Sequence, residues 1–461
     1  MSQAASSDDK ITLISDWNGT VTEQPAPASH GEGPVVTDKS YQQYLDRLAE
    51  NPLLTDDNIR LSKDQVGGVR RFLGGAGTIG LAATLLGAAI LNPFHALAAF
   101  EVGVFTALAC SLGSLFVVML FHILNVNWGI TLRRQLENVA SIIWVPIFGL
   151  LLITLIELPL SDGLLLQWLR PEHEGNYLLG KKAGFLNPGF FVIRVLIYGT
   201  VWFLLARTLA SNSTDQDVTG DRMNSRRSRQ IAGFGLLLFA LTTAFAAFDF
   251  LMSMDFRFFS TMWGVYYFAG AAMSACALAA VITAAMRVTG RLNGVVTKEH
   301  YHDLGKLLFA FTVFWSYIAF SQYFLIWYGN IPEETAWFLF RKTGGWDILF
   351  ILLIVGHFTV PLLVLISRNV KKATLGLAAF GVLMLVMQVF DMVFVIRPMV
   401  YIDQPWSPDP VGPAGWWLDI AGVIGVLGVF GYFLLGKITQ SALIPIKDPR
   451  LEECLKHKNY V

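Results

Sequence analysis

Long apolar stretches alternate with short polar loops along the chain from about residue 70 onward. Each stretch approaches or exceeds about 20 residues, the length that an α-helix needs to cross the hydrocarbon core of a membrane. The pattern predicts ten spans, with approximate limits at 71–91, 97–124, 134–158, 188–210, 231–253, 259–286, 304–329, 346–367, 373–398 and 414–436. The chain is therefore predicted to be an all-α integral membrane protein with about ten transmembrane helices.

Polar segments flank this membrane domain at both ends. Residues 1–69 are rich in Ser, Asp, Gly, Pro and Gln and contain no long apolar run. Such a composition favours disorder in an isolated segment, although Tyr41 to Leu54 has the pattern of a short amphipathic helix. We expect three parts: a polar tail at 1–69, a ten-helix domain at 70–437 and a second polar tail at 438–461.

Composition supports a membrane protein and excludes several functions. Of the 461 residues, 54% are hydrophobic and only 15% are charged, whereas a soluble domain is about one quarter charged. The net charge of zero argues against a nucleic-acid partner, which would favour a basic excess. Cys110, Cys276 and Cys454 lie far apart and form no C-x-x-C or C-x-x-C-H motif. We expect no metal site, iron–sulfur cluster or covalently bound haem in this chain.

The distribution of Lys and Arg among the short loops predicts the orientation in the membrane. Loops on one side, such as those containing Arg226 and Arg291, carry about twice as many basic residues as loops on the other side. An even number of spans places both tails on the same side of the membrane, and the loops on that side are the more basic ones. Both termini are therefore predicted to be cytoplasmic.

A weak internal repeat divides the spans into two groups. The sequence LLARTLA closes the fourth span and VLISRNV closes the eighth, while FAAFDFLM lies in the fifth span and MQVFDMVF in the ninth. An offset of four helices preserves orientation, as in the parallel repeats of some membrane transporters. The repeat predicts two four-helix bundles, formed by spans 2–5 and 6–9, with spans 1 and 10 flanking them.

The seventh span carries an unusual number of polar residues for a membrane helix. At 100° per residue, Tyr317 and Ser321 fall on nearly the same face as Lys306. Their hydroxyl groups can both donate and accept hydrogen bonds, as proton transfer requires. The candidate proton-path residues are Glu299, His302, Asp303, Lys306, Tyr317, Ser321, His357 and Asp391. The alternative is that Tyr317 and Ser321 only connect packed helices.

A second polar group is expected near the non-cytoplasmic surface. His95 begins the second span, Glu157 ends the third, and Asp249 and Asp255 surround the end of the fifth. Oxidation of a quinol requires bases that take the hydroxyl protons, and a histidine beside carboxylates near lipid fits this need. The alternative is a polar rim that satisfies helix ends. The histidines of the spans lie at different depths, which argues against a pair of haem ligands.

Three segments of the chain resemble a known membrane-protein family. VTKEHYHDLGKLLFAFTVFWSYIAFSQYFLIWYGNIPEET is similar to a signature of the ActF-type membrane subunit of bacterial alternative complex III, within the NrfD or polysulfide reductase membrane-subunit family. FAAFDFLMSMDFRFFSTMWGVYYFAG and FHALAAFEVGVFTALACSLGSLF resemble the same subunit. The resemblance covers roughly residues 90–400, and it implies a ten-helix protein with two four-helix bundles.

The resemblance also implies a function within a larger complex. Such complexes oxidise a quinol, for which menaquinone is one candidate, and pass electrons through iron–sulfur clusters to c-type haems in other subunits. Partners would be an NrfD-like sister membrane subunit, an iron–sulfur subunit, c-type cytochromes, lipids and, in some assemblies, a terminal oxidase. His95 and Asp249 match quinol-site positions of the sister subunit, and Glu157 matches loosely. For ActF-type subunits proton conduction is the implied alternative to quinol binding.

We interpret the chain as a subunit of a quinol:cytochrome c oxidoreductase, or of a complex with another acceptor, in a bacterial plasma membrane. It would support the quinol site and conduct protons, with no redox cofactor and no catalytic residue of its own. The alternative is a free-standing secondary transporter in which Asp249, Lys306 and Asp391 bind a coupling ion. Transporters favour Gly or Pro breaks near such residues, and the sequence lacks them there.

Overall fold

The structure is a computed structural model that describes residues 11–15, 21–25, 38–401 and 415–459. The chain divides into two compact units, Met1–Glu50 and Asn51–Val461. The first unit contains an antiparallel hairpin of β1 (Ile11–Ser15) and β2 (Val21–Pro25), in which Leu13 pairs with Glu23. It also contains α1 (Asp38–Ala49), which confirms a short helix in this part of the polar tail.

All the regular secondary structure described in the second unit is helical. In chain order its elements are η1 (Pro52–Leu54), α2 (Asp56–Ile59), α3 (Lys63–Ile90), α4 (Pro93–Ile123), α5 (Ile130–Ser141), α6 (Trp144–Leu155), η2 (Ile156–Leu160), η3 (Gln167–Leu169), η4 (Pro171–His173), α7 (Tyr177–Lys182), α8 (Pro188–Thr219), α9 (Met223–Ala247), η5 (Phe248–Met252), α10 (Trp263–Val288), α11 (Lys298–Gly329), α12 (Pro332–Phe340), α13 (Trp346–Leu352), η6 (Leu353–Thr359), α14 (Val360–Leu365), α15 (Arg368–Lys372), α16 (Thr374–Ile396), η7 (Arg397–Tyr401), α17 (Trp416–Ile438) and α18 (Leu451–Leu455).

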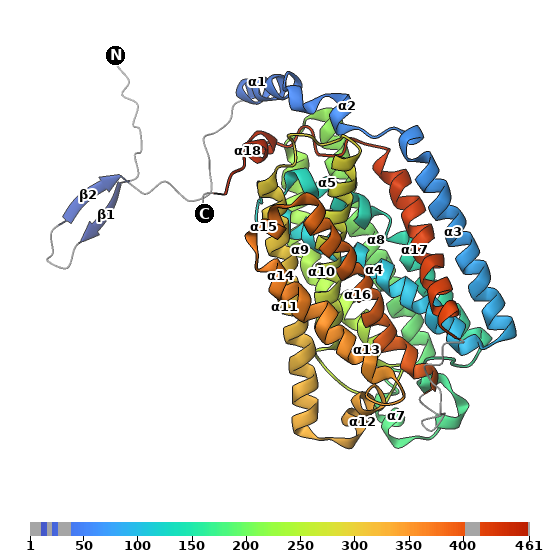
Figure 1. Cartoon of the computed structure of the whole chain (residues 1–461). Coiled ribbons are helices and arrows are strands. Elements are labelled where there is room, and N and C mark those ends of the chain that lie inside the picture. Colours follow the sequence, from blue (N-terminus) through green and yellow to red (C-terminus); the bar gives the residue numbers. More distant parts are fainter. Residues whose placement is uncertain (1–10, 16–20, 26–37, 402–414, 460–461) are drawn as a thin grey trace, which may run out of the picture. The chain divides into compact units, whose positions relative to one another are not determined.

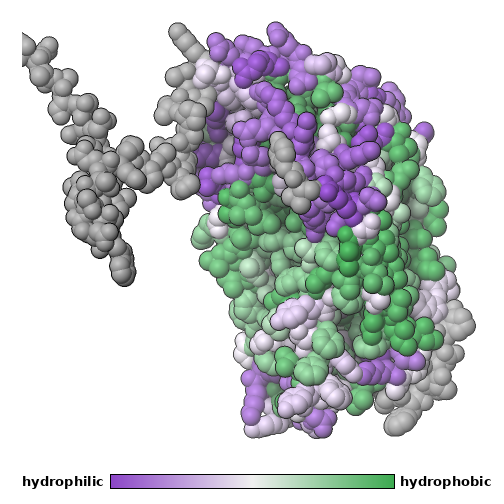
Figure 2. Space-filling model, turned by 60° about the vertical axis from the view of Figure 1, so that its left-hand side comes forward, coloured by the Kyte–Doolittle hydropathy of each residue, from purple (hydrophilic) through white to green (hydrophobic). Residues whose placement is uncertain are grey.

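Ten of the described helical segments are long and apolar enough to cross a membrane, which confirms the predicted number of spans. On the face drawn in Figure 2 an apolar belt covers the middle of the helices, and a strongly hydrophilic cap covers the end where α2, α5, α15 and α18 lie (Figures 1 and 2). Side chains on the belt, such as Phe72 and Ile79 of α3, are exposed in the isolated chain because they would face lipid or a partner.

The helices form the two predicted bundles. The first contains α4, α5–α6–η2, α8 and α9–η5, and the second contains α10, α11, α13–η6–α14 and α16. Helices α4 and α10 are the most buried spans and pack against each other, so they join the two bundles. Their contact is close because Gly113 of α4 lies against the backbone of α10, where a Cβ atom would be 1.8 Å from the Ala271 oxygen.

Helices α3 and α17 form a separate pair beside the first bundle. Glycines allow this pair to pack backbone to backbone: a Cβ on Gly80 of α3 would lie 2.6 Å from the nitrogen of Gly425 of α17. Small residues at such contacts are typical of helix association in membranes, where lipid supplies no hydrophobic force between helices. The pair corresponds to the two flanking spans expected from the sequence.

The polar segments next to the spans pack on the helical domain. The compact unit begins at Asn51, earlier than the predicted domain boundary at residue 70. Asn58 contacts the α10–α11 connection, where its side chain donates to the Asn293 oxygen at 2.9 Å. After α17 the chain crosses the same end of the bundle, and the Leu443 nitrogen donates to the Ile59 oxygen at 2.7 Å. Both segments therefore contribute to the hydrophilic cap.

Buried ion pairs hold the C-terminal segment against α5. Arg133 of α5 contacts Glu137 at 2.9 Å and Asp448 at 2.9 Å, and all three side chains are buried. Burial alone would raise the pKa of the Asp448 carboxyl, but the charges of Arg133 and Arg450 hold that pKa below its ordinary value. The Asp448 carboxylate therefore stabilises the fold in its ionised form.

Replacing Asp448 with asparagine should lower the free energy of unfolding at pH 7 by about 3–5 kcal/mol, because Arg133 would lose its buried partner. A depressed carboxyl pKa stabilises the fold above the unfolded-state pKa of about 3.9, and the contribution disappears as pH falls through the folded-state pKa. Denaturation of the detergent-solubilised protein should show this acid-dependent step in the wild type, and Asp448→Asn should lose it. Glu333→Gln, at an exposed carboxylate, is the control and should keep the step. Equal stability of Asp448→Asn and wild type at pH 7 would contradict the assignment.

Candidate functional site

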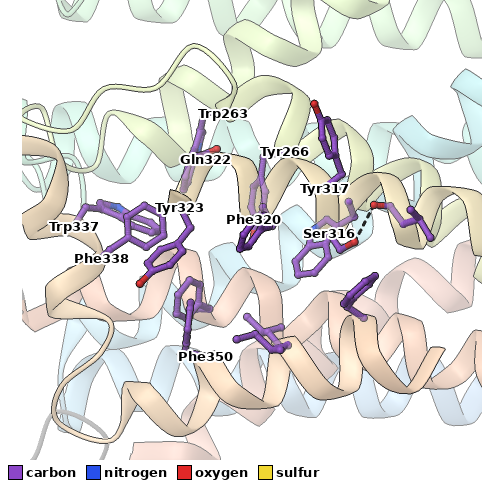
Figure 3. A pocket seen from close by; sticks show the side chains of 17 residues that line it. Trp263, Tyr266, Ser316, Tyr317, Phe320, Gln322, Tyr323, Trp337, Phe338 and Phe350 are labelled. Carbon is purple, nitrogen blue, oxygen red and sulfur yellow. Dashed lines mark hydrogen bonds between the residues drawn. The ribbon is translucent and has the colours of Figure 1, made fainter. Parts of the chain in front are cut away.

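A cavity of about 610 Å³ lies in the second bundle between α11 and α13–η6 (Figure 3). The start of α10, helix α12 and the end of α16 complete it. Its lining residues are Trp263, Tyr266, Val313, Trp315, Ser316, Tyr317, Ala319, Phe320, Gln322, Tyr323, Trp337, Phe338, Phe350, Leu353, Ile354, Phe358 and Phe394. Phe320 and Ile354 are exposed on the outside of the helices, so the cavity opens sideways toward the lipid.

A buried carboxylate lies directly behind this aromatic pocket. Asp391 of α16 is 1% exposed and accepts a hydrogen bond from the Tyr266 hydroxyl. It also accepts from Trp315, whose Nε1 lies 3.3 Å from the carboxylate. Because Tyr266 and Trp315 line the pocket, they connect its interior to Asp391. Asp391 could therefore take a proton from a ligand only through a side chain such as Tyr266, whose hydroxyl both donates and accepts.

Two polar atoms in the pocket lack partners. Trp263 Nε1 and the side-chain oxygen of Gln322 are buried, and neither has a hydrogen-bond partner among the residues that the structure describes. Both residues line the pocket, where Figure 3 shows them among its side chains. An unsatisfied buried polar atom costs about 1–3 kcal/mol, so a ligand or water that pairs with these atoms would bind favourably. The wall of the pocket thus contains one buried donor and one buried acceptor that have no partner among the described residues.

The helix that forms one side of the pocket is not a regular α-helix. It contains the π-helical segment η6, which supplies Leu353, Ile354 and Phe358 to the lining. The same segment places His357 inside the bundle, where its ring stacks on Trp315 at a centroid distance of 3.8 Å. His357 Nε2 lies 3.1 Å from the sulfur of Met273. Single π-turns in α-helices occur frequently at functional sites.

Two other membrane helices contain π-helical segments among the described residues, and each holds a buried carboxylate. These segments are η2, with Glu157, and η5, with Asp249. The helix thus changes geometry at Asp249, although it has no Gly or Pro there of the kind that breaks transporter helices. By contrast, α11 and α16 continue as α-helices through Lys306 and Asp391.

The predicted outer cluster is divided among separate partners. His95 Nε2 lies 3.1 Å from Asp419 Oδ1, and the same carboxylate oxygen accepts from Arg397 Nε at 2.7 Å. Asp249 accepts two hydrogen bonds from Arg194, at 2.8 and 2.7 Å, and a third from Tyr198 at 2.7 Å.

The two remaining members of this cluster also have partners of their own. Glu157 accepts from three consecutive backbone nitrogens of residues 164–166, at 2.9–3.3 Å. Asp255 pairs with Arg257 at 2.8 Å. These carboxylates therefore satisfy loops and helix ends locally, and quinol binding by His95, Glu157, Asp249 and Asp255 stays a prediction.

The polar start of α11 forms a network with the C-terminal segment. Asp303 accepts from Lys306 at 2.8 Å and from Asn459 at 3.2 Å, and His457 Nε2 lies 2.7 Å from its other oxygen. Glu299 pairs with Lys372 and lies 4.0 Å from His302. The structure thus brings together the four charged candidates at this end of α11, and it adds His457 and Asn459, whose contribution no local sequence pattern indicated.

The remaining candidates on α11 are not buried. Tyr317 is 64% exposed, and its ring is turned away from the other labelled side chains of the pocket (Figure 3). Ser321 is half-buried. Among the described residues, no hydrogen bond joins Lys306 to Tyr317 or to Asp391. The predicted stripe therefore reaches the membrane surface of the isolated chain, and a proton path along it would need lipid-side water or a partner subunit.

No protein-family model and no curated protein matches this chain. What the structure establishes is a multi-pass, all-α membrane domain with ten candidate spans. Among the described residues, no group of three or more His, Cys, Asp or Glu side chains is arranged to hold a metal ion. The assignment of function therefore depends on the chemistry of the aromatic pocket.

Proposed function

We propose that the chain is an ActF-type integral membrane subunit of a bacterial quinol-oxidising respiratory complex, and that the aromatic pocket receives the quinol. One observation carries this proposal: a lipid-facing pocket lined by Tyr266 and Trp315, which both hydrogen-bond to the buried Asp391. The resemblance of residues 90–400 to the NrfD family supports the same class of complex.

The size and lining of the pocket suit a quinol head group that enters from the membrane. A volume of about 610 Å³ lies in the range of about 300–1,000 Å³ that is typical of small-molecule sites. Aromatic rings on several sides can stack on a planar ring. The free oxygen of Gln322 can accept from one quinol hydroxyl, and Trp263 Nε1 can donate to a ring oxygen. The lateral opening leaves room for an isoprenoid tail in the lipid.

Quinol oxidation releases two protons and two electrons and leaves a quinone. In the proposed site Tyr266 accepts one hydroxyl proton from the quinol as its own proton passes to Asp391. The second proton passes to water beside Tyr323, which lines the pocket and whose hydroxyl accepts a hydrogen bond from Lys342. The electrons pass to acceptors in partner subunits, for which iron–sulfur clusters and c-type haems are the expected classes. The expected neighbours are a sister membrane subunit, an iron–sulfur subunit and c-type cytochromes.

Proton conduction is the second part of the proposal. Gln388 lies on α16 one turn from Asp391, and both of its side-chain polar atoms are buried without a partner among the described residues. His357 Nδ1 is also buried without a partner among the described residues. Water bound to these atoms would extend the hydrogen-bonded group around Asp391 toward the cytoplasmic half. Asp303 and Lys306 would exchange protons with the solvent at the far end of α11.

Equilibrium binding of a short-chain quinone to the purified protein in lipid nanodiscs tests the pocket assignment. Gln322→Leu should weaken binding about five- to tenfold, because a ligand hydroxyl would lose its acceptor. Gln230→Leu, at an exposed position of α9, is the matched control and should leave the dissociation constant unchanged. Equal affinity of the Gln322→Leu protein and the wild type would contradict quinol binding in this pocket.

The proposed location is the bacterial plasma membrane with both termini in the cytoplasm. The three native cysteines are buried, so a single introduced thiol reports its own position. A cysteine replacing the exposed Val218, at the end of α8, should react with a membrane-impermeant maleimide only from the cytoplasmic side. A cysteine replacing the exposed Glu174 should react only from outside. The opposite labelling pattern would reverse the orientation inferred from the basic loops.

A further inference from the structure

A second cavity lies outside the bundles, where the start of α3 meets the end of α17. Its volume is about 340 Å³, and its lining residues are Lys63, Asp64, Val66, Gly67, Arg70, Arg71, Tyr432 and Thr439. The basic residues recur at helical spacing, so Lys63 and Arg70 lie two turns apart on one face of α3. This basic cavity is separate from the aromatic pocket and from every residue in the proposed quinol chemistry.

The arginine at the centre of the basic cavity is held in place. The Arg70 guanidinium stacks on the Tyr432 ring at 4.2 Å, and its Nε donates to the backbone carbonyl oxygen of Tyr432 at 3.2 Å. Glycines make room for this arrangement, since a Cβ on Gly74 would lie 2.9 Å from the Tyr432 ring and one on Gly436 would lie 3.0 Å from the guanidinium. The terminal nitrogens of Arg70 remain available to a ligand.

The protein neutralises the positive charge of this cavity only in part. No ion pair among the described residues involves Lys63, Arg70 or Arg71. The N-terminal backbone of α3 is already capped by Ser62 and Gln65, so the basic side chains supply the excess charge. Asp64 is the one acidic residue of the lining, which leaves a local surplus of two positive charges.

The surroundings of the cavity indicate a lipid. Helix α3 enters the apolar belt directly after these residues, and Phe72, the neighbour of Arg71, is 72% exposed. An acyl chain can lie on this apolar surface while its phosphate lies in the cavity. Basic pockets between membrane helices at the cytoplasmic surface are suited to acidic lipid head groups.

We propose that this basic cavity binds the phosphate of an anionic phospholipid of the cytoplasmic leaflet. Arg70 contacts the phosphate oxygens through its terminal nitrogens, with Lys63 and Arg71 beside it. The absent side chain at Gly67 leaves the space for the head group, because a Cβ there meets no atom within 4 Å. The lipid would thereby brace the α3–α17 pair, whose packing depends on close backbone contact.

Native mass spectrometry of the protein, isolated with its copurifying subunits and exchanged into nanodiscs of phosphatidylglycerol and phosphatidylcholine, tests this site. The wild type should retain phosphatidylglycerol preferentially. The double variant Arg70→Gln/Arg71→Gln should reduce that preference about tenfold or more, since each basic residue near a membrane surface contributes about fivefold. Arg226→Gln/Arg227→Gln removes two exposed charges from the same side and should leave the preference within about twofold.

A second variant separates a defined site from a general effect of charge. Gly67→Leu keeps every charge and improves helix propensity, yet its side chain would occupy the cavity. The lipid preference should fall as it does in the double arginine variant. Unchanged preference in Gly67→Leu, or an equal loss in the Arg226/Arg227 control, would overturn the site. Displacement of phosphatidylglycerol by millimolar inorganic phosphate would instead identify a soluble anion as the ligand and overturn the lipid assignment.

Discussion

Replacing Asp391 with asparagine should lower quinol-dependent electron transfer by about 10²–10³-fold, because general acid–base groups contribute rate factors of this size. Asparagine keeps one acceptor oxygen, which can serve the Tyr266 hydroxyl, but it loses the oxygen that Trp315 contacts and cannot hold the proton that Tyr266 would pass on. Asp391 does not line the pocket itself, so the KM for quinol should change by less than about threefold. The fall should appear in kcat, measured as acceptor reduction by the isolated complex.

Two further variants show whether the loss follows the proposed proton route. Tyr266→Phe removes the hydroxyl that connects the pocket to Asp391, and it should also reduce kcat strongly. Asp347→Asn changes an exposed carboxylate on α13, three residues before the pocket residue Phe350. Asp347 does not line the pocket, so this variant should leave turnover unaffected. Retention of full kcat in Asp391→Asn with an assembled complex would remove this carboxylate from the mechanism.

Gly113→Ala should cause the largest loss of stability among single substitutions of small residues. The added Cβ would lie 1.8 Å from the Ala271 oxygen and 2.5 Å from the Ala271 carbonyl carbon. Neither atom belongs to a side chain that could rotate away, so α4 and α10 would have to separate along the contact that joins the bundles. Overpacking of this kind costs about 1–3 kcal/mol, and more where backbone must move. Denaturation in detergent, followed by the recovery of monodisperse protein, measures the effect.

Gly233→Ala is the matched control for this substitution. Gly233 lies on α9 and has no atom within 4 Å of its ideal Cβ position. Alanine there should be neutral or stabilise the helix by up to about 1 kcal/mol, as its helix propensity predicts. If both variants unfold alike, the close approach of α4 and α10 is not a determinant of stability, and the joint between the two bundles would need another explanation.

The sequence was sufficient to predict the architecture, because the features that determine it are local. Apolar runs of membrane-spanning length are visible without any partner, and the ten spans and the two bundles of four follow from their order. The boundaries were less predictable. The composition of residues 51–62 predicts part of a polar tail. In the structure Asn58 and Ile59 contact segments more than 200 residues away, and no local pattern indicates such contacts.

The candidate site was predictable only in part. Asp391 was a candidate because a carboxylate inside a membrane is energetically costly and often has a functional role. The structure places two hydrogen-bond donors beside it. Its partners Tyr266 and Trp315 lie 125 and 76 residues away, and an aromatic residue in an apolar helix usually indicates packing. Gln322 was visible as a polar residue in a span, but its unsatisfied oxygen depends on the three-dimensional surroundings.

Two other expectations depended on packing that the sequence does not encode locally. The helical phase correctly places Tyr317 and Lys306 on one face of α11, yet the neighbouring helices decide which face is covered, and Tyr317 remains exposed. His95 and Asp249 lie near the same predicted end of their spans, but Asp419 and Arg194 supply each with a separate partner. The π-helical turns carry no Gly or Pro signal at Asp249, so this change in helix geometry could not be anticipated.

Photocrosslinking with a quinol analogue that carries a photoreactive group on its ring tests quinol binding in the aromatic pocket most directly. The labelled peptides of the intact complex would be mapped by mass spectrometry, with unlabelled quinol as the competitor. The pocket assignment predicts labelling within 313–323 of α11 and 350–358 of α13–η6, and protection of both segments by the competitor. Competitor-sensitive labelling near His95 and Asp249, with none in those two segments, would contradict it.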